Sequence, residues 1–329
     1  MAGVLGPWVR LEGISISQLP AGGKGIPLGT ADPTPTSPQE ARPSAPPPLS
    51  LQSFVQQVLS ESLPFIDNVA PKYSTSTSTG TSTGTENPSS LWRPKGAPRT
   101  YDASAAPVHV YERVVSRREL DDVEGISKLT TDRKDETWFC RRSCHRDAAE
   151  PGTASWAEFV HAFKEYHAES EQAFTPTIIG HRRALSWDFN GVDVEAAGER
   201  WTDVTVVVEE MTHRIDPKPL KNRTFPVLQL CASLAGTREF VVASIPIHDF
   251  HKSPYAEYAR DSSLVVARYA AVERIRVLPG EQGEEIEWIM GTASDAGGVL
   301  PQWLQNLAVP GAVAKDVDMF LRWIQSQRK

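Results

Sequence analysis

The sequence predicts an α+β fold in which a curved antiparallel β-sheet wraps around a long C-terminal helix. Between residues 181 and 292, six segments rich in Val, Ile, Trp and Tyr follow one another. Turn signals such as Asn190-Gly191 and Pro279-Gly280 separate them, so an antiparallel meander is expected. Apolar residues then recur at helical spacing over residues 301–327. At ~1.5 Å per residue, that helix would run roughly 40 Å and cross a whole domain.

Composition sets the protein class. The chain has 329 residues, 40% of them hydrophobic, which is enough for one sizeable core. Its formal net charge is −7, so no general attraction to nucleic acid is expected. No segment has the length of a membrane span or the pattern of a secretory signal. The three cysteines are sparse, as in reducing compartments. We therefore expect a soluble, cytoplasmic protein.

The N-terminal quarter alternates between low-complexity tracts and one amphipathic segment. Residues 1–20 should pack peripherally, residues 21–49 form a Pro-rich linker, and residues 73–90 form a disordered Ser/Thr-rich insert. Between these tracts, the apolar stripe of residues 51–63, with Ser50 as N-cap, predicts a helix within residues 50–72. This helix must dock on the main domain, which we assign to residues 91–329.

Within the main domain, a strand is expected at residues 138–140. A helix should follow that starts after Ser155 and reaches residue 166 or 167. The six further strands are expected at residues 181–189, 201–213, 225–234, 239–248, 263–277 and 285–292. In the final helix, Pro310-Gly311 should produce a kink or a division into two parts.

No catalytic or metal motif emerges. Cys140, Cys144 and His145 invite a metal site, but no second ligand pair follows, so two thiols on one strand are the simpler interpretation. The chain has none of the HExxH, GxSxG or GxGxxG motifs. The turn at Ser294-Asp295 with Gly297-Gly298 before a helix could bind an anion, but more often such a turn redirects the chain. We assign no catalytic residue and no metal ligand.

Residues 288–304 resemble the last strand, turn and helix start of START lipid-transfer domains, where a Ser/Asp-Gly turn leads into a Pro-x-Trp/Leu helix. The chain is most similar to a fungal START-like family of unknown function. Further resemblance lies in residues 65–67, 108–115, 138–144 and 308–317. The resemblance implies a START-like helix-grip fold with an apolar tunnel for one lipid or sterol-like molecule and no cofactor.

Strand alternation selects the residues that should face this tunnel. In residues 181–189, Arg183 and Trp187 share the bulkier, more apolar face. In residues 264–277, Tyr269 and Glu273 lie on the likelier interior face. We expect Arg183 and Glu273 to form a buried pair that holds a lipid head group or ordered water. Alternatively, a bulge shifts the register and leaves both at a solvated rim.

The expected ligand-binding residues combine these strand positions with the final helix. A cavity on the order of 300 to 1,000 Å³ is expected. Its boundary should be formed by Arg183, Trp187, Tyr269, Glu273, Trp288, Trp303, Leu304, Leu307, Val317 and Phe320. The half-helix between Gly297-Gly298 and Pro310-Gly311 is expected to act as a lid that tilts outward at a bilayer.

Three functional hypotheses remain open at this point. The first is a non-enzymatic protein that binds a lipid, transfers it between membranes and touches their surface transiently. The second is a helix-grip enzyme that uses His181, Arg183, Tyr269 and Glu273. The third is an interaction protein whose domain senses a ligand. A cavity lined mostly by carbon would favour the first hypothesis, three or more converging ionisable groups the second, and a filled cavity the third. No oligomeric state is predicted.

Overall fold

The computed structural model describes residues 5–26, 49–67, 69, 91–123, 134–280, 283–299 and 302–328. Its helical elements are η1 (Ile16–Gln18), α1 (Leu51–Asp67), α2 (Arg117–Asp121), α3 (Trp156–Val160), η2 (His161–Glu165), α4 (His167–Phe174), η3 (Phe250–Lys252), η4 (Tyr258–Arg260) and α5 (Gln302–Gln327). Its strands are β1 (Lys24–Gly25), β2 (Arg93–Pro94), β3 (Arg99–Tyr101), β4 (Ser104–Val115), β5 (Glu136–Arg146), β6 (Ile178–Trp187), β7 (Val194–Ala196), β8 (Glu199–His213), β9 (Arg223–Leu234), β10 (Glu239–Pro246), β11 (Val265–Val266), β12 (Arg268–Gly280) and β13 (Gly283–Asp295).

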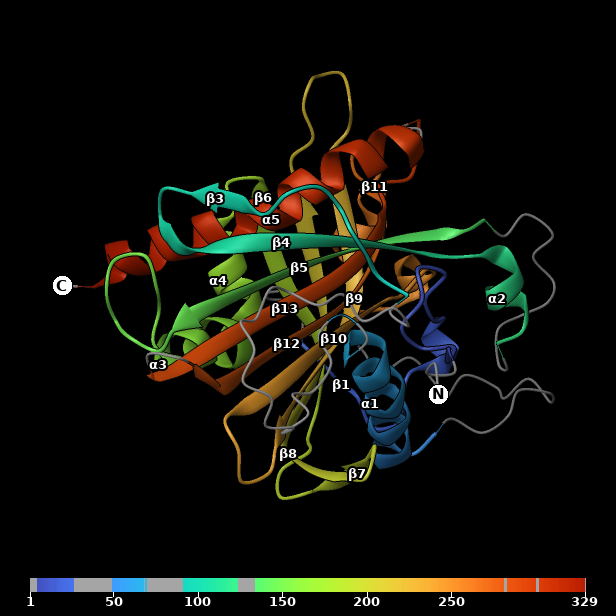
Figure 1. The fold of residues 1–329 in the computed structure, drawn as a ribbon. Helices are drawn as coiled ribbons and strands as arrows, with labels where there is room; N and C mark the ends of the chain where they lie inside the picture. The colour runs from blue at the N-terminus through green and yellow to red at the C-terminus, as the bar shows by residue number, and fades with distance from the viewer. Residues whose placement is uncertain are drawn as a thin grey trace.

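The described strands form one 13-stranded sheet, in the main order β1-β6-β8-β9-β10-β12-β13-β5-β4-β2. Neighbours along this path are antiparallel, and β8 to β13 follow one another as hairpins apart from the short β11. Figure 1 shows the sheet curved beneath the long red helix α5. The predicted α+β fold class, a curved antiparallel sheet with a long C-terminal helix lying across it, is confirmed.

The two faces of the sheet carry different layers. On the inner face, α3, η2, α4 and α5 cover an apolar cluster that includes Phe163, Ile275, Trp288 and Phe320. On the outer face, α1 and the N-terminal segment cover a second cluster that includes Val241, Ala243 and Ile245. Because side chains alternate along each strand, successive residues of β10 and β12 contribute to opposite clusters.

Helix α1 is fixed to the outer face by more than its apolar stripe. Glu61 accepts hydrogen bonds from the backbone N–H groups of Trp8 and Val9 at 2.8 and 2.9 Å. The Arg10 guanidinium lies 3.1 Å from the Glu61 carboxylate, and both side chains are almost fully buried. These buried hydrogen bonds and this ion pair hold the N-terminal segment against α1.

Several local expectations need correction. The helix predicted from Ser155 divides into α3, the π-helical turn η2 and α4, with a break at Tyr166. Helix α5 continues through Pro310 without the expected division. Lys24 and Gly25, inside the predicted linker, pair with β6. The rest of that linker and the whole Ser/Thr-rich insert lie outside the described residues.

Candidate ligand-binding site

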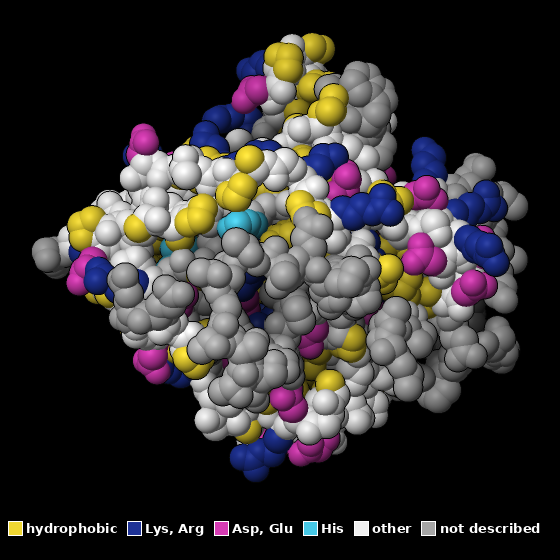
Figure 2. All heavy atoms as spheres, viewed as in Figure 1, with side chains coloured by type: hydrophobic (Ala, Val, Ile, Leu, Met, Phe, Trp, Pro, Cys, Tyr) yellow, Lys and Arg dark blue, Asp and Glu magenta, His cyan; other side chains and the backbone are white. Residues whose placement is uncertain are grey.

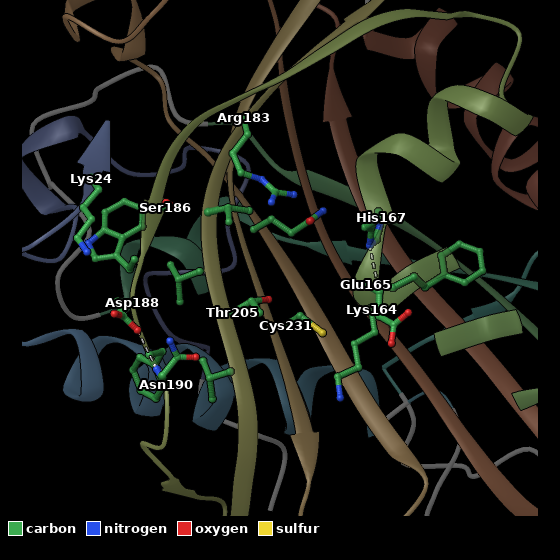
Figure 3. Close-up of a pocket in the computed structure, with 17 residues that line it drawn as sticks. Lys24, Lys164, Glu165, His167, Arg183, Ser186, Asp188, Asn190, Thr205 and Cys231 are labelled. Carbon is green, nitrogen blue, oxygen red and sulfur yellow. Dashed lines mark hydrogen bonds between the residues drawn. The ribbon is translucent and has the colours of Figure 1, made fainter. Parts of the chain in front are cut away.

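A pocket of about 360 Å³ opens on the inner face between η2 and the β6 side of the sheet. Figure 3 shows its walls, which mix charged and small polar side chains. Six of them define its lip and floor: Lys164, Glu165, His167, Arg183, Thr205 and Cys231. The volume falls within the ~300–1,000 Å³ typical of small-molecule sites.

The lip of the pocket depends on the π-helical turn. Ser155 caps α3 in a capping box with Glu158, which fixes where the helix starts. One extra residue in η2 then lets Phe163 pack inward while Lys164 reaches Asp203 on β8 at 3.2 Å. Single π-turns of this kind occur frequently at functional sites. The salt bridge holds the lip close to the sheet edge.

A buried ion pair lies deeper on the same face. Arg141 on β5 contacts Glu273 on β12 at 3.2 Å, and Trp288 on β13 donates to the same carboxylate oxygen at 2.6 Å. The Arg141 guanidinium also lies 3.7 Å from the centre of the Trp288 ring. Arg141 and Glu273 are 2% and 5% exposed. Such a pair is stable only with further partners, and two Arg141 nitrogens, Nε and Nη1, have none among the described residues.

One row of side chains joins this ion pair to the pocket. Arg141 pairs in register with Met290, Met290 with Glu273, and Glu273 with Val242. Val242 pairs with Cys231, and Cys231 with Thr205. Cross-strand partners share a face, so the row runs across five neighbouring strand pairs from the ion pair to the pocket floor. The pocket and the ion pair therefore belong to one inner surface.

Helix α4 adds a second charged pair. His167 Nε2 lies 3.8 Å from Glu171, and His167 Nδ1 is 3.0 Å from the carbonyl oxygen of Phe163. Burial lowers the pKa of His167, but the hydrogen bond to Glu171 and the charge of Glu171 outweigh this effect and raise it to about 9. Burial raises the pKa of Glu171, but His167 outweighs that effect and lowers it. Both groups are therefore charged near neutral pH.

Helix α5 and β12 complete the group with Asp316 and Tyr269. Burial raises the pKa of Asp316 to about 7, and the negative charges of Glu171 and Glu273 add to this effect against the attraction of Arg141. Burial likewise raises the pKa of Tyr269, whose hydroxyl bonds to Ser244 at 3.2 Å. Both side chains remain half-buried. We call Arg141, His167, Glu171, Tyr269, Glu273 and Asp316 the inner ionisable group.

The predicted Arg183–Glu273 pair does not form. Arg183 bonds Glu209 at 2.7 Å, and its side chain is 41% exposed at the pocket mouth, whereas Glu273 pairs with Arg141. Residue 183 lies on β6 and residue 273 on β12, four strands apart, or roughly 19 Å at ~4.8 Å per strand. A register shift between Arg183 and Leu185 also breaks the expected alternation, so Trp187 packs against the N-terminal segment and donates to the Pro20 carbonyl.

Trp288, Val317, Phe320 and Leu307, which were also predicted to bound the cavity, do not line the pocket. Trp288, Val317 and Phe320 are fully buried in a packed aromatic cluster, with the Trp288 and Phe320 ring centres 5.3 Å apart. Leu307 is 71% exposed, so it does not face the interior. The side chains of Trp303 and Leu304 lie outside the described part of the structure. The apolar end of the expected cavity is thus occupied by protein side chains.

Strand alternation places the two cysteines and His145 on different faces of β5. Cys140 and Cys144 lie on β5 with even spacing, while His145 points to the opposite face, beside Phe159 and Trp288. Burial raises the pKa of Cys144 to about 11 and lowers the pKa of His145 to about 3. No group of three His, Cys, Asp or Glu side chains suited to a metal occurs among the described residues.

Arg141, His167, Glu171 and Asp316 were absent from the sequence-based list. The clearest available signal was in helix α5, where Asp316 interrupts the apolar stripe between Val313 and Val317. For Arg141 the sequence offered only one cation among several in a strand. A charged residue on a face that is otherwise apolar is the pattern that would have identified Asp316.

Comparisons with known proteins place these features in context. A protein-family model described as "Protein of unknown function (DUF3074)" matches residues 138–324. The crystal structure of human STARD10 is similar with a TM-score of 0.44 and 15% sequence identity, covering 71% of this chain and 73% of that one. The human StarD13 (DLC2) lipid transfer and protein localization domain gives a TM-score of 0.39 and 11% identity, covering 71% and 89%. No curated protein sequence matches the chain.

Proposed function

The chain belongs to DUF3074, a family described as proteins of unknown function, and we propose that it binds one amphipathic small molecule, such as a lipid or sterol-like compound, on its inner face. The observation that carries this proposal is the row of side chains from the Arg141–Glu273 pair to the pocket floor at Thr205. Buried polar atoms without hydrogen-bond partners are costly, and a ligand that extends from the pocket along this row to Arg141 would supply the missing acceptors.

The proposed ligand has two unlike parts. Its polar end would lie near Arg141 and Asp316, where hydrogen-bond donors and acceptors of the protein are unsatisfied or half-buried. Its apolar body would lie along Val207 and Trp187, which line the pocket beside the charged lip. The site is more polar than the apolar tunnel expected from the sequence. This balance supports a ligand with a substantial head group.

Transfer between membranes requires a surface that can contact lipid. Val299 and Leu307 are 82% and 71% exposed near the start of α5. The base of the projecting β8–β9 loop lies beside them, since Arg223 donates to the Ala296 carbonyl at 3.0 Å. That loop exposes Lys218 and Lys221, with Pro217 and Pro219 on either side of Lys218, and Figure 2 shows hydrophobic and cationic atoms together at this projection. We propose this end as the membrane-contacting surface. None of the described helices could itself span a membrane.

Native mass spectrometry with lipid extraction tests the binding proposal. Wild-type protein should carry a co-purified or added amphiphile, and the Arg141→Met variant should retain it at least tenfold less because the polar anchor is lost. Thr205→Trp should have a similar effect, since the exposed Thr205 lines the pocket and a large side chain there would fill it. Arg322→Met removes an exposed charge outside the pocket and serves as the matched control.

Circular dichroism must show that each variant folds. The proposal is refuted if wild-type protein shows only the mass of the unliganded chain, and if adding a phospholipid, fatty acid or sterol does not change that mass. Ligand retained equally by Arg141→Met and Thr205→Trp would mean that binding occurs at another place.

A second candidate function is acid–base catalysis on the bound molecule. It is favoured by the inner ionisable group, because more than three ionisable side chains converge there, and above all by Asp316, whose pKa of about 7 suits proton transfer near neutral pH. The same extraction distinguishes the two functions. A binding protein returns the added molecule unchanged, whereas an enzyme returns a product that Asp316→Asn no longer forms.

A further inference from the structure

The outer face carries a cluster of arginines that the proposed ligand site does not involve. Arg142 on β5 and Arg276 on β12 each donate to Glu287 on β13 at 2.7 Å, one to each carboxylate oxygen. Arg274 lies 3.7 Å from the same carboxylate and also bonds Asp67, the last residue of α1. We call Arg142, Arg274 and Arg276 the outer arginine cluster.

Hydrogen-bond donors exceed acceptors in this cluster. Each guanidinium has five N–H donors, so about fifteen face the oxygens of two carboxylates. Arg274 Nε, Arg274 Nη2 and Arg276 Nη2 make no hydrogen bond to the described residues, although these two side chains are 1% and 5% exposed. A buried donor without an acceptor costs free energy unless a water or an ion satisfies it. The arrangement therefore lacks acceptor oxygens.

Neighbouring groups supply only part of them: the Tyr111 side chain hydrogen-bonds Arg142, but the three nitrogens of Arg274 and Arg276 still lack an acceptor in the described structure. Burial raises the pKa of Cys144 to about 11, so this thiol remains neutral. Glu239 stands opposite Arg276 in register, yet Arg276 Nη2 makes no hydrogen bond within the described part of the chain. Glu285 is the register partner of Arg146, one row further along the face. Burial raises the pKa of Glu287, but Arg276, Arg142 and Arg274 together hold it below its ordinary value. Glu287 is therefore ionised, and both of its oxygens already accept hydrogen bonds from Arg142 and Arg276.

We propose that the outer arginine cluster is a binding site for a phosphate group. Tetrahedral oxyanions present several acceptor oxygens that match guanidinium forks, often in pairs of parallel hydrogen bonds. The Arg142 and Asp67 side chains, 26% and 29% exposed, form the open edge through which such a group would enter. The inference is independent of the proposed ligand site.

Two sources of phosphate fit this chemistry. One is free phosphate or a small phosphate ester. The other is the chain itself, because ten of the twelve residues from Ser74 to Thr85 are Ser or Thr. Ser74 is seven residues from Asp67, which contacts the cluster, and seven residues span at most ~25 Å. Such tethering gives a phosphorylated residue a high effective concentration at the cluster.

The first experiment titrates inorganic phosphate into the unphosphorylated full chain, with chloride at equal ionic strength as the reference. Isothermal calorimetry and melting temperature should report one saturable site. Arg142→Gln should weaken it at least tenfold, and Arg142→Lys, which keeps the charge but loses the fork, should also weaken it. Arg146→Gln is the matched control, since Arg146 lies four residues along the same strand and pairs with Glu150 instead.

The second experiment phosphorylates the Ser/Thr run and follows the phosphate by ³¹P NMR against pH. Contact with the cluster should lower the second pKa of the phosphomonoester from its usual value of about 6, and Arg142→Gln should restore it. The bound phosphoryl group should also prevent free phosphate from binding to the cluster. Saturable binding in the first experiment alone identifies free phosphate as the source, and a shifted phosphomonoester identifies the chain. A wild-type chain indistinguishable from Arg142→Gln in both experiments overturns the proposal.

Discussion

Asp316 is the side chain whose environment conflicts most with its usual chemistry. It lies on α5, half-buried, and makes no hydrogen bond within the described structure. Burial and the carboxylates of Glu171 and Glu273 favour its neutral form. A folded-state pKa of about 7, against an ordinary value of 3.8, means that ionisation at neutral pH works against folding. Retaining a costly group in the interior is typical of functional positions.

We therefore predict that Asp316→Asn stabilises the protein in a pH-dependent way. The unfolded chain ionises above pH 3.8, while the folded protein keeps its proton to about pH 7, so the cost in the wild type grows over this interval and is constant above it. The variant should gain on the order of 2–4 kcal/mol at pH 8 and little at pH 4. Urea unfolding at several pH values measures this difference.

Asp318, two residues further along α5, supplies a control with the opposite sign. It accepts from Ala103 N at 3.1 Å and from Arg322 Nε at 2.9 Å. Burial raises its pKa, but these partners lower it overall. Asp318→Asn should thus destabilise the protein at pH 7 and lose its effect as the pH falls below about 4. Equal pH profiles for the two variants would contradict the assignment.

The residues of the site were predictable from the sequence only in part. Alternation over residues 264–277 placed Tyr269 and Glu273 on the inner face, where the structure has them. The partner of Glu273 was missed because cross-strand rows depend on register, which alternation within one strand does not determine. In residues 181–189 a bulge shifted the register, the alternative considered for Arg183, which lies at the rim.

At the scale of elements, side-chain hydrogen bonds attach the first half of α5 to the sheet and to the turn before it. Asn306 Nδ2 donates to Thr137 Oγ1 on β5 at 3.2 Å, and Gln305 accepts from Ala296 N at 2.7 Å. Gly297 and Gly298 precede the helix with φ of 60° and 66°, a conformation that other residues rarely adopt. Pro310 removes one helical hydrogen bond further along. These features are consistent with the predicted lid.

A disulfide between the half-helix and the sheet tests the lid directly. We predict that Asn306→Cys with Thr137→Cys, whose native side chains are in contact, abolishes exchange of the bound molecule between vesicles when oxidised. Reduction should restore exchange, because the lid is then free to tilt. The single Asn306→Cys variant controls for the substitution, and unchanged exchange in the oxidised protein would place the entrance elsewhere.

Helical periodicity was a good guide to whole helices and a poor one to their interruptions. The apolar stripe of α1 predicted its packing face, although the helix continues through Pro64 to Asp67. The π-turn in η2 was not predicted, because an inserted residue is stabilised by tertiary contacts such as Lys164 with Asp203. Such contacts leave no periodic trace in the sequence.

At the scale of the whole molecule, the meander was predictable because its strands are consecutive and separated by short turns. The two edges were not. At one edge β1 contributes two residues, Lys24 and Gly25, and at the other β2 pairs with β4, which itself pairs with β5. These short strands pair with strands that are distant in the sequence, so no local pattern of alternation identifies them.

The outer face makes the N-terminal elements part of the fold. Seven large apolar side chains of α1 are buried against the sheet: Phe54, Val55, Val58, Leu59, Leu63, Phe65 and Ile66. At roughly 1.5–3 kcal/mol each, their burial contributes about 10–20 kcal/mol. That is at least as large as the ~5–15 kcal/mol net stability of a typical domain. The segment matched by the family model, residues 138–324, does not include them.

We therefore predict that a fragment of residues 134–329 neither folds cooperatively nor stays monomeric, since it lacks β4, the partner of β5, and exposes the apolar outer face that α1 covers. Deleting residues 74–85 from the full chain removes part of the low-complexity tract without touching α1, and this variant should unfold within about 0.5 kcal/mol of the wild type. Size-exclusion chromatography and hydrogen exchange of both proteins measure the contrast. A monomeric fragment with wild-type protection in β10 and β12 would show that α1 is an accessory to the sheet, not part of its core.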